Sequence, residues 1–421
     1  MTVEKIQAQC EALREAGREL RRRPALEVLQ LLEDLLDLIS DERSDRRREL
    51  ALELPKATGF TAPVVRRGLE LGFGDWRGRA FRELVSRELG ATLESGSLCV
   101  SGFPTTAVLL AGSIPMPSLL SIVAPLALGS PVLVKPASRD RVTPRIVAES
   151  IADLDAELGR CVGIVDFPGS DDACSRAFAS AECVVATGSD ETVSRVGRLV
   201  APPRRFVGYG HRLSIATLSD ASTRGTAVDD VTARLALDIA LWDQLGCLSP
   251  LAIFVPSADP RAPDRVAEAL ANALVKVEED LPRGDVDSHS ASAIHHERGQ
   301  AEMRAAAGKR VAVLGSASTA WTVVREDTPE IRPAPLHRFV RVMPVTDLSK
   351  LIAALAPLGP HLAAVAVEGF GAEEPALCSA LANLGASRLC RAGRMQSPPL
   401  GWRHDNRGVL TPIARFTDIH L

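Results

Sequence analysis

The fold is decided by LAGSIP at residues 110–115 and GSPVLVKPAS at residues 129–138. The apolar residues 107–111 predict a buried strand, and residues 116–128 predict a helix bounded by Pro115 and Gly129. Residues 131–134 predict a second strand, so the segment forms a β-α-β unit of a parallel sheet. Lys135 would then stand at the edge where such sheets bind nucleotides. Taken alone, Lys135 is more commonly a surface lysine after a buried strand.

The same alternation continues along the chain. It predicts helices over residues 143–158, 173–180 and 191–199, and strands over residues 162–166 and 183–186. The segment VVATGSDETV (184–193) ends a strand in Gly188 and Ser189 just before a helix. Free N–H groups at a helix start can hold a phosphate, although Ser189 or Asp190 also suits a plain N-cap. The pattern predicts a doubly wound parallel sheet.

A second α/β block is predicted beyond residue 226. We expect a helix over 228–245, then the turn GCLSP (246–250), with an acidic loop over 279–289. The further elements are strands 251–255, 310–314, 339–345, 362–367 and 388–390, and helices 265–277 and 374–384.

Residues 1–50 predict helices. The leucines of LEVLQLLEDLLDLI (26–39) recur at helical spacing, which favours a helical hairpin packed on the rest of the chain over a coiled-coil or partner-binding role. The arginines at 21–23 and 46–48 are expected on a solvated face.

Length and composition exclude several classes. A chain of 421 residues exceeds one hydrophobic core, and its net charge of -4 gives no electrostatic support for a nucleic-acid partner. The N-terminus lacks a signal-peptide core, and Gly112, Pro115, Pro117 and Pro125 interrupt the most apolar stretch. We therefore expect a cytoplasmic protein without a membrane span.

The eight cysteines form no C-x-x-C pair and accompany no histidine cluster, so we expect neither a metal site nor a disulfide framework. Most are expected to be small buried hydrophobic residues. Cys247 differs, because it lies where a long helix breaks, between Gly246 and Leu-Ser-Pro. Its N–H could donate to an oxyanion, and its thiolate is a nucleophile that needs no strong base beside it. A buried cysteine near a helix end is the simpler alternative.

Together these segments resemble the LuxC-type acyl-CoA reductases of the aldehyde dehydrogenase superfamily. The most specific string is Asp-Gln-x-x-Cys-Leu-Ser-Pro (243–250). The resemblance also rests on Leu54-Pro55, TGFT (58–61), Tyr209-Gly210 with Ser214, GASR (385–388), GRM (393–395) and WRHD (402–405).

The resemblance implies an α/β, aldehyde-dehydrogenase-like fold with a Rossmann-type doubly wound cofactor domain, an α/β catalytic domain and a helical N-terminal segment. We expect a helical region at 1–95, an NADP-binding domain at 96–225 and a catalytic domain with the nucleophilic cysteine at 226–395. Residues 396–421 would close the site or an oligomer interface.

The resemblance also assigns candidate residues to the cofactor and the nucleophile. Cys247 corresponds to the nucleophile that attacks the carbonyl carbon. Lys135 corresponds to the lysine that contacts the adenosine ribose or its phosphate, and Gly188 and Ser189 to the turn beneath the pyrophosphate. The remaining expected cofactor residues are Ala111, Gly112, Ser138 and Gly210.

Three further features refine the expected chemistry. Ser113 stands where the family has an oxyanion-stabilising asparagine, and its hydroxyl can donate one hydrogen bond. The region FVGYGH (206–211) lacks the glutamate that activates water in hydrolytic relatives, which favours acyl-CoA chemistry. Ser138, where NAD-preferring relatives carry glutamate, and the adjacent Arg139 favour NADPH. His404 could supply a proton or line the acyl site, and a structural role is equally compatible.

The sequence therefore predicts NADPH-dependent reduction of an acyl-CoA, with a fatty chain implied by the family, to an aldehyde through an acyl-cysteine. One alternative is a CoA-acylating dehydrogenase that runs oxidatively. Another is an inactive scaffold, favoured by Ser113 and by Asn406 where the family prefers glycine. A homodimer or larger homo-oligomer and an acyl-transferring partner protein are also expected.

Overall fold

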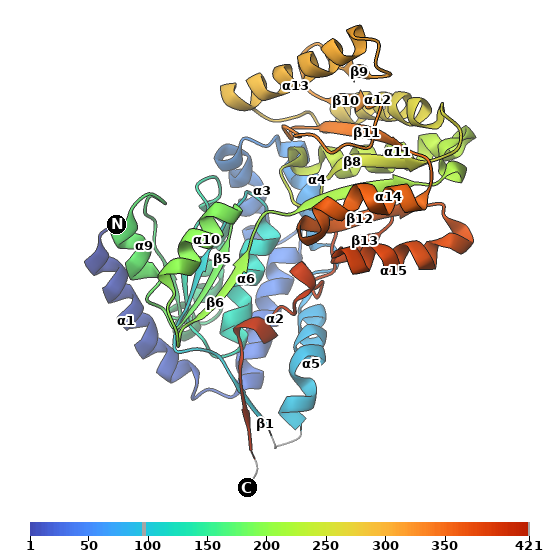
Figure 1. The fold of residues 1–421 in the computed structure, drawn as a ribbon. Helices are drawn as coiled ribbons and strands as arrows, with labels where there is room; N and C mark the ends of the chain where they lie inside the picture. Colours follow the sequence, from blue (N-terminus) through green and yellow to red (C-terminus); the bar gives the residue numbers. More distant parts are fainter. Residues whose placement is uncertain (95–97, 420–421) are drawn as a thin grey trace. The chain divides into compact units, whose positions relative to one another are not determined.

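The computed structural model describes residues 1–94 and 98–419, which form two compact units (Figure 1). The first unit contains residues 1–58, 72–211 and 399–421. The second contains residues 59–71 and 212–398. The expected boundaries were 95/96, 225/226 and 395/396; in the structure residues 1–58 and the C-terminal segment pack within the first unit, whereas residues 59–71 pack within the second.

The first unit is built on a five-stranded sheet in the order β4-β3-β2-β5-β6, with every neighbouring pair parallel. Its strands are β2 (Thr106–Leu109), β3 (Val132–Lys135), β4 (Val162–Ile164), β5 (Cys183–Thr187) and β6 (Arg205–Tyr209). The connecting helices are α6 (Pro115–Ala127), α7 (Val142–Leu154), α8 (Ala156–Gly159), α9 (Asp172–Phe178) and α10 (Asp190–Leu199). The predicted doubly wound sheet is confirmed. The helix predicted over 143–158 is interrupted at Asp155, whose extended backbone and side chain cap α8.

The helical N-terminal region comprises α1 (Val3–Leu20), α2 (Ala25–Ser40), α3 (Asp45–Thr58), α4 (Ala62–Phe73) and α5 (Gly78–Glu94). Helix α1 buries Ile6, Cys10 and Leu13 in a core shared with Leu133 of β3 and Val184 of β5. The leucine-rich helix α2 buries Leu32, Leu35 and Leu36 and contacts α5, α6 and α7. It therefore packs on the chain itself, and the coiled-coil alternative is wrong.

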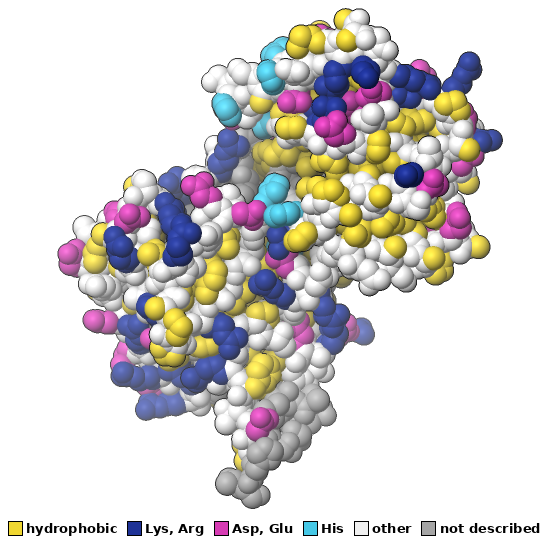
Figure 2. Space-filling view, viewed as in Figure 1, with side chains coloured by type: hydrophobic (Ala, Val, Ile, Leu, Met, Phe, Trp, Pro, Cys, Tyr) yellow, Lys and Arg dark blue, Asp and Glu magenta, His cyan; other side chains and the backbone are white. Residues whose placement is uncertain are grey.

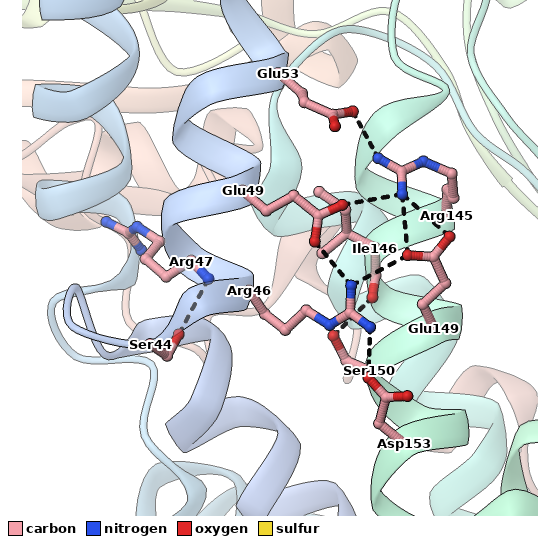
Figure 3. Close-up of polar contacts among 10 residues, drawn as sticks. All are labelled: Ser44, Arg46, Arg47, Glu49, Glu53, Arg145, Ile146, Glu149, Ser150 and Asp153. Atoms are coloured by element: carbon pink, nitrogen blue, oxygen red, sulfur yellow. Dashed lines mark hydrogen bonds and ion pairs between the residues drawn. The ribbon is translucent and has the colours of Figure 1, made fainter.

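An ion-pair network joins α3 to α7 (Figure 3). Arg145 pairs with Glu49 at 3.1 Å, with Glu53 at 2.6 Å and with Glu149 at 3.0 Å. Arg46 pairs with Glu49 at 2.8 Å and with Glu149 at 3.2 Å. Glu49 and Glu149 each contact both guanidinium groups, so the network holds α3 against α7, a helix that covers the sheet.

The expectation of a solvated arginine face is wrong for Arg47. This side chain is buried, its guanidinium lies 5.2 Å from the centre of the Phe73 ring, and Nη1 donates to the Ile39 carbonyl. Arg46 and Arg47 are adjacent in a helix and therefore point in different directions, so one sequence run of arginines serves both an ion-pair surface and a buried contact. Arg21 and Arg22 are exposed as expected.

The second unit contains a seven-stranded sheet in the order β13-β12-β7-β8-β11-β10-β9, parallel except for the antiparallel pair β9–β10. Its strands are β7 (Leu213–Leu218), β8 (Pro250–Pro256), β9 (Ala312–Gly315), β10 (Thr322–Arg325), β11 (Phe339–Val345), β12 (Leu362–Glu368) and β13 (Arg388–Cys390). Its longer helices are α11 (Gly225–Ala240), α12 (Ala262–Asp280), α13 (Ser288–Ala306), α14 (Leu348–Leu355) and α15 (Glu374–Leu384). Because β7 is a central strand here, residues 212–225 belong to this unit.

One hydrophobic cluster of the second unit lies between its sheet and the helices α14 and α15. Phe254 and Val365 are fully buried in it, and Leu348 and Ile352 of α14 pack against it while partly exposed. Figure 2 shows hydrophobic side chains gathered over these helices, so this core reaches the surface.

Further elements differ from the sequence-based expectation or add to it. The helix predicted over 228–245 ends at Ala240, because the next residues adopt left-handed backbone angles. Residues 279–280 and 288–289, expected in a loop, belong to α12 and α13. In the first unit, β1 (Leu98–Ser101) pairs with β14 (Arg415–Asp418), which places the C-terminal strand beside an N-terminal one.

Within the described part of the chain, no helix is long and apolar enough to cross a membrane. Across residues 1–94 and 98–419, no three His, Cys, Asp or Glu side chains gather in a way that could hold a metal ion.

Candidate functional site

Cys247 lies in a turn between α11 and β8, and its side chain is exposed. The approach to the turn is unusual, because Trp242, Asp243 and Gln244 have φ angles of 54°, 49° and 62°. A left-handed conformation costs an L-residue about 1–2 kcal/mol, so the three residues together hold roughly 3–6 kcal/mol of strain. Strain of this kind persists only where surrounding contacts enforce it, and it concentrates at functional sites.

An ion pair in the interior enforces the conformation of Asp243. Its Oδ1 accepts from Nη2 of Arg338 at 2.6 Å and from Nε at 3.2 Å, and its Oδ2 accepts from the Gly284 N–H at 3.0 Å. Arg338 is 1% exposed and also pairs with Glu278 at 2.7 Å. The Asp243 carboxylate therefore holds the strained backbone before Cys247 in place.

The buried side-chain amide of Gln244 also holds the turn in place. Its Nε2 donates to the carbonyls of Pro250 and Phe339, both at 2.9 Å, and its Oε1 accepts from the Phe339 N–H at 2.8 Å. Because these bonds reach the first residue of β8 and the first residue of β11, Gln244 ties the turn to the sheet.

Packing holds the first of the three residues. The Trp242 ring meets Phe60 edge-on at a centroid distance of 5.6 Å. A Cβ atom added to Gly68 of α4 would lie 2.4 Å from the Trp242 ring, so the indole fits only against a glycine. The TGFT segment and α4 thus support the cysteine turn.

The GRM segment holds the end of α11. Asp238 is fully buried, and its carboxylate accepts from the N–H groups of Gly393 at 2.5 Å and Met395 at 3.1 Å. Burial raises the pKa of Asp238 to about 7. Gln396 then donates to the Asp238 carbonyl at 3.1 Å and to the Ser249 hydroxyl at 2.8 Å. The residue that follows the GRM segment therefore reaches the cysteine turn through Ser249.

The expected cofactor residues all lie in the first unit. Ala111, Gly112 and Ser113 form the turn after β2; Gly112 is exposed, Ala111 is half-buried and Ser113 is buried. Gly112 has φ +82°, and no heavy atom lies within 4 Å of the place where a Cβ would stand. An open glycine turn at the carboxyl edge of a parallel sheet suits the close approach of a dinucleotide, so these residues fit the cofactor.

Lys135 ends β3 beside that turn. It is half-buried, its Nζ lies 5.1 Å from the centre of the Phe167 ring, and burial lowers its pKa. Ser138 is exposed, and its carbonyl accepts from Nη1 of Arg141 at 3.3 Å. Lys135 therefore lies at the carboxyl end of β3, as predicted, and Ser138 follows that end.

Gly188 and Ser189 lie between β5 and α10, and Gly210 follows β6. The Ser189 hydroxyl accepts from the Thr192 N–H at 3.2 Å, so it caps its own helix. The Gly188 N–H donates to the Tyr209 carbonyl at 3.1 Å, which brings the ends of β5 and β6 together. Because β2, β3, β5 and β6 are parallel, all these candidates share one edge of the sheet.

The C-terminal segment brings His404 to the end of β6. Its ring stacks on Tyr209 at a centroid distance of 5.1 Å, and Trp402 meets it edge-on at 5.0 Å. Arg407 lies 5.6 Å above the Tyr209 ring. Burial raises the pKa of Tyr209 to about 12.

One carboxylate anchors the C-terminal segment. Glu88 of α5 accepts from the N–H groups of Val409 at 2.8 Å, Leu410 at 2.9 Å and Thr411 at 3.1 Å.

Sequence reasoning located the nucleophile candidate but missed the residues that support it. Arg338 and Gln396 carry no local signal, because each contacts the turn across a long sequence separation. Tyr209 was noted in the sequence as part of Tyr209-Gly210, but its stacking on His404 was not foreseen. Of the other cysteines, Cys10, Cys161, Cys174 and Cys183 are buried as expected, whereas Cys99 is exposed. Exposure alone therefore does not single out Cys247.

Two relatives are similar over much of the chain. The long-chain acyl-protein thioester reductase 2 of Photobacterium leiognathi is 22% identical over 314 residues, which cover 73% of this chain and 62% of that protein. The long-chain acyl-protein thioester reductase of Aliivibrio fischeri is 22% identical over 394 residues, covering 89% and 78%. The chain thus spans less than two thirds of the first relative.

Solved aldehyde dehydrogenases share the fold. A NAD-dependent benzaldehyde dehydrogenase from Corynebacterium glutamicum superposes with a TM-score of 0.75 at 17% identity, covering 100% of this chain and 90% of that one. A NADP-dependent glyceraldehyde-3-phosphate dehydrogenase from Bacillus halodurans gives 0.75 at 14% identity, covering 100% and 92%. The expected aldehyde-dehydrogenase-like fold is confirmed. The family model described as acyl-CoA reductase (LuxC) matches residues 22–416, so the chain belongs to that family.

Proposed function

We propose that this protein reduces an acyl thioester to an aldehyde with NADPH, and that Cys247 carries the acyl group. The observation that carries the proposal is an exposed cysteine in a turn whose backbone strain is held by buried polar contacts. A residue that served packing alone would need neither the exposure nor the strain. Membership of the acyl-CoA reductase (LuxC) family supports the same chemistry.

The reaction begins with addition of the Cys247 thiolate to the thioester carbonyl carbon. The new C–S bond forms as the bond to the donor thiol breaks, and the donor thiolate leaves with a proton. Bound NADPH would supply the hydride that reduces the enzyme thioester. The C–S bond to Cys247 then breaks, which releases the aldehyde and regenerates the thiolate. The sum is acyl thioester, hydride and proton converted to aldehyde and thiol.

Other residues of this chain have supporting roles in the proposal. Ser113 would donate to the oxyanion, at reduced reach compared with asparagine. The segment 206–211 offers no carboxylate to activate water, so the acyl group would persist on the enzyme until it is reduced. His404, held against Tyr209, would supply a proton or line the acyl site.

The cofactor residues follow from the edge of the first sheet. Ala111, Gly112 and Gly210 would line the dinucleotide, and Lys135 would contact its adenosine ribose or phosphate. Gly188 and Ser189 would lie beneath the pyrophosphate. Because no acidic side chain stands at Ser138, a 2′-phosphate would meet no repulsion there, and the adjacent Arg139 favours it.

Acyl-CoA is the proposed donor, and the names of the relatives make an acylated carrier protein the second donor to test. The chain itself is proposed to act as a homodimer or larger homo-oligomer.

The deciding experiment compares Cys247→Ala with Cys99→Ala, since both side chains are exposed. Each variant is incubated with a mass-tagged acyl-CoA, or with the acylated carrier, and the adduct is located by peptide mass spectrometry. Aldehyde formation is followed by NADPH absorbance. We expect Cys99→Ala to keep both activities and Cys247→Ala to lose both. Aldehyde formation by Cys247→Ala would refute the proposal.

A further inference from the structure

We propose that Ser214 is a positioning residue for Cys247: its hydroxyl bridges the cysteine carbonyl to the neighbouring strand and holds the nucleophile in its reactive orientation. This inference rests on the proposed function, because it assigns a role relative to the acyl-carrying cysteine.

Ser214 stands where the sheet is irregular on both sides. Its strand β7 is paired with β8, and the register shifts between Ser214 and Ile215. On the other side β7 is paired with β12, and the register shifts between Leu362 and Val365. The partner of Ser214 in β8 is Pro250, which has no N–H to contribute to a ladder. Irregularities of this kind occur beside active sites, where they redirect a side chain or end the pairing.

The Ser214 hydroxyl makes hydrogen bonds toward both neighbouring strands. It donates to the carbonyl of Cys247 at 2.6 Å and accepts from the N–H of Ala364 at 3.1 Å. The residue is fully buried, so water cannot replace either bond. A donor–acceptor chain in a low-dielectric interior polarises its members and strengthens both bonds.

The Cys247 side chain is exposed, so the position of its Sγ depends on the backbone that carries it. The carbonyl carbon, the side chain and the backbone nitrogen share one Cα, so fixing the carbonyl limits where Sγ can lie. The bonds made by Gln244 and Gln396 reach Pro250 and Ser249, whereas the bond from Ser214 reaches the cysteine itself. A misplacement of about 1 Å can cost on the order of 100-fold in rate.

The test uses Ser214→Ala together with the isosteric pair Ser214→Thr and Ser214→Val. Threonine keeps the hydroxyl and valine replaces it with a methyl group of similar shape, so that their difference isolates the hydrogen bonds. Thr217→Val is the matched control, because Thr217 is a fully buried residue of the same strand whose hydroxyl has no hydrogen-bond partner within the described residues. All variants are compared by melting temperature, by kcat and KM for acyl-CoA, and by the acylation rate of the cysteine.

We expect Ser214→Ala and Ser214→Val to lower kcat and the acylation rate by roughly 10- to 100-fold while KM changes little. Ser214→Thr should retain most of kcat, and Thr217→Val all of it. If Ser214→Ala fails to fold, the threonine–valine comparison decides. Equal kcat in Ser214→Thr and Ser214→Val, or an equal loss in Thr217→Val, would overturn the positioning role. The Cys247→Ala variant, measured in parallel, separates the positioning role of Ser214 from the proposed function. If Cys247→Ala retains turnover, the proposed function is refuted instead.

Discussion

Replacing Asp243 with asparagine tests whether a buried ion pair maintains the strained cysteine turn. The carboxylate receives two bonds from Arg338, at 2.6 and 3.2 Å, and one from the Gly284 N–H at 3.0 Å. Asparagine tolerates left-handed φ angles, so the substitution removes the charge without adding a conformational penalty at φ 49°. Because asparagine has a single acceptor oxygen, a loss of stability reports the ion pair together with the hydrogen bond that the amide nitrogen can no longer accept.

The expected loss of unfolding free energy depends on the contacts that Arg338 keeps in the variant. Removing one partner of a buried pair costs about 3–5 kcal/mol, because the other charge is left uncompensated. Arg338 keeps Glu278 at 2.7 Å and the carbonyls of Leu281 at 2.8 Å and Ala240 at 3.2 Å, which lowers the cost. We expect the unfolding free energy of the second unit to fall by roughly 2–4 kcal/mol.

Urea unfolding measures the global change, and hydrogen exchange of peptides covering residues 240–250 measures it locally. Glu278→Gln is the control: its side chain is 27% exposed, and we expect a loss of about 1 kcal/mol or less. The Asp243→Asn variant should also exchange faster in the cysteine turn. If it loses no more stability than Glu278→Gln, the ion pair does not maintain the turn and the reasoning fails.

Two further predictions concern the same unit. Gly68→Ala should destabilise this unit, because the added Cβ would lie 2.4 Å from the Trp242 ring. Such overpacking costs about 1–3 kcal/mol, which outweighs the roughly 1 kcal/mol that alanine gains over glycine in a helix. A raised urea midpoint would contradict this. Asp238 has a pKa raised by burial from 3.8 to about 7, so the folded protein holds a proton that the unfolded chain releases. Its contribution to the unfolding free energy therefore falls between about pH 4 and pH 7 and is constant above that, whereas Asp238→Asn should lack this fall. Parallel urea-midpoint profiles of the two proteins over this pH range would count against the assignment.

The pattern of alternating strands and helices was predictable from the sequence, because buried parallel strands are short apolar runs and their helices are amphipathic. The same local logic placed Lys135 and Gly112 at strand ends. It failed for α13, whose sequence SHSASAIHHERGQAEMRAA has few apolar residues at helical spacing and buries only Ile294 and Ala301.

By itself, the sequence determined that a helix must break before Cys247, since Gly246 and Pro250 flank it. Only the tertiary structure decided how it breaks. The left-handed backbone of residues 242–244 is locally unfavourable, and it persists because Arg338 and Phe339, about 95 residues further along the chain, bond to Asp243 and Gln244. Secondary-structure preferences depend on neighbouring residues. Backbone strain and the orientation of the nucleophile depend on contacts that exist only after the sheet has assembled.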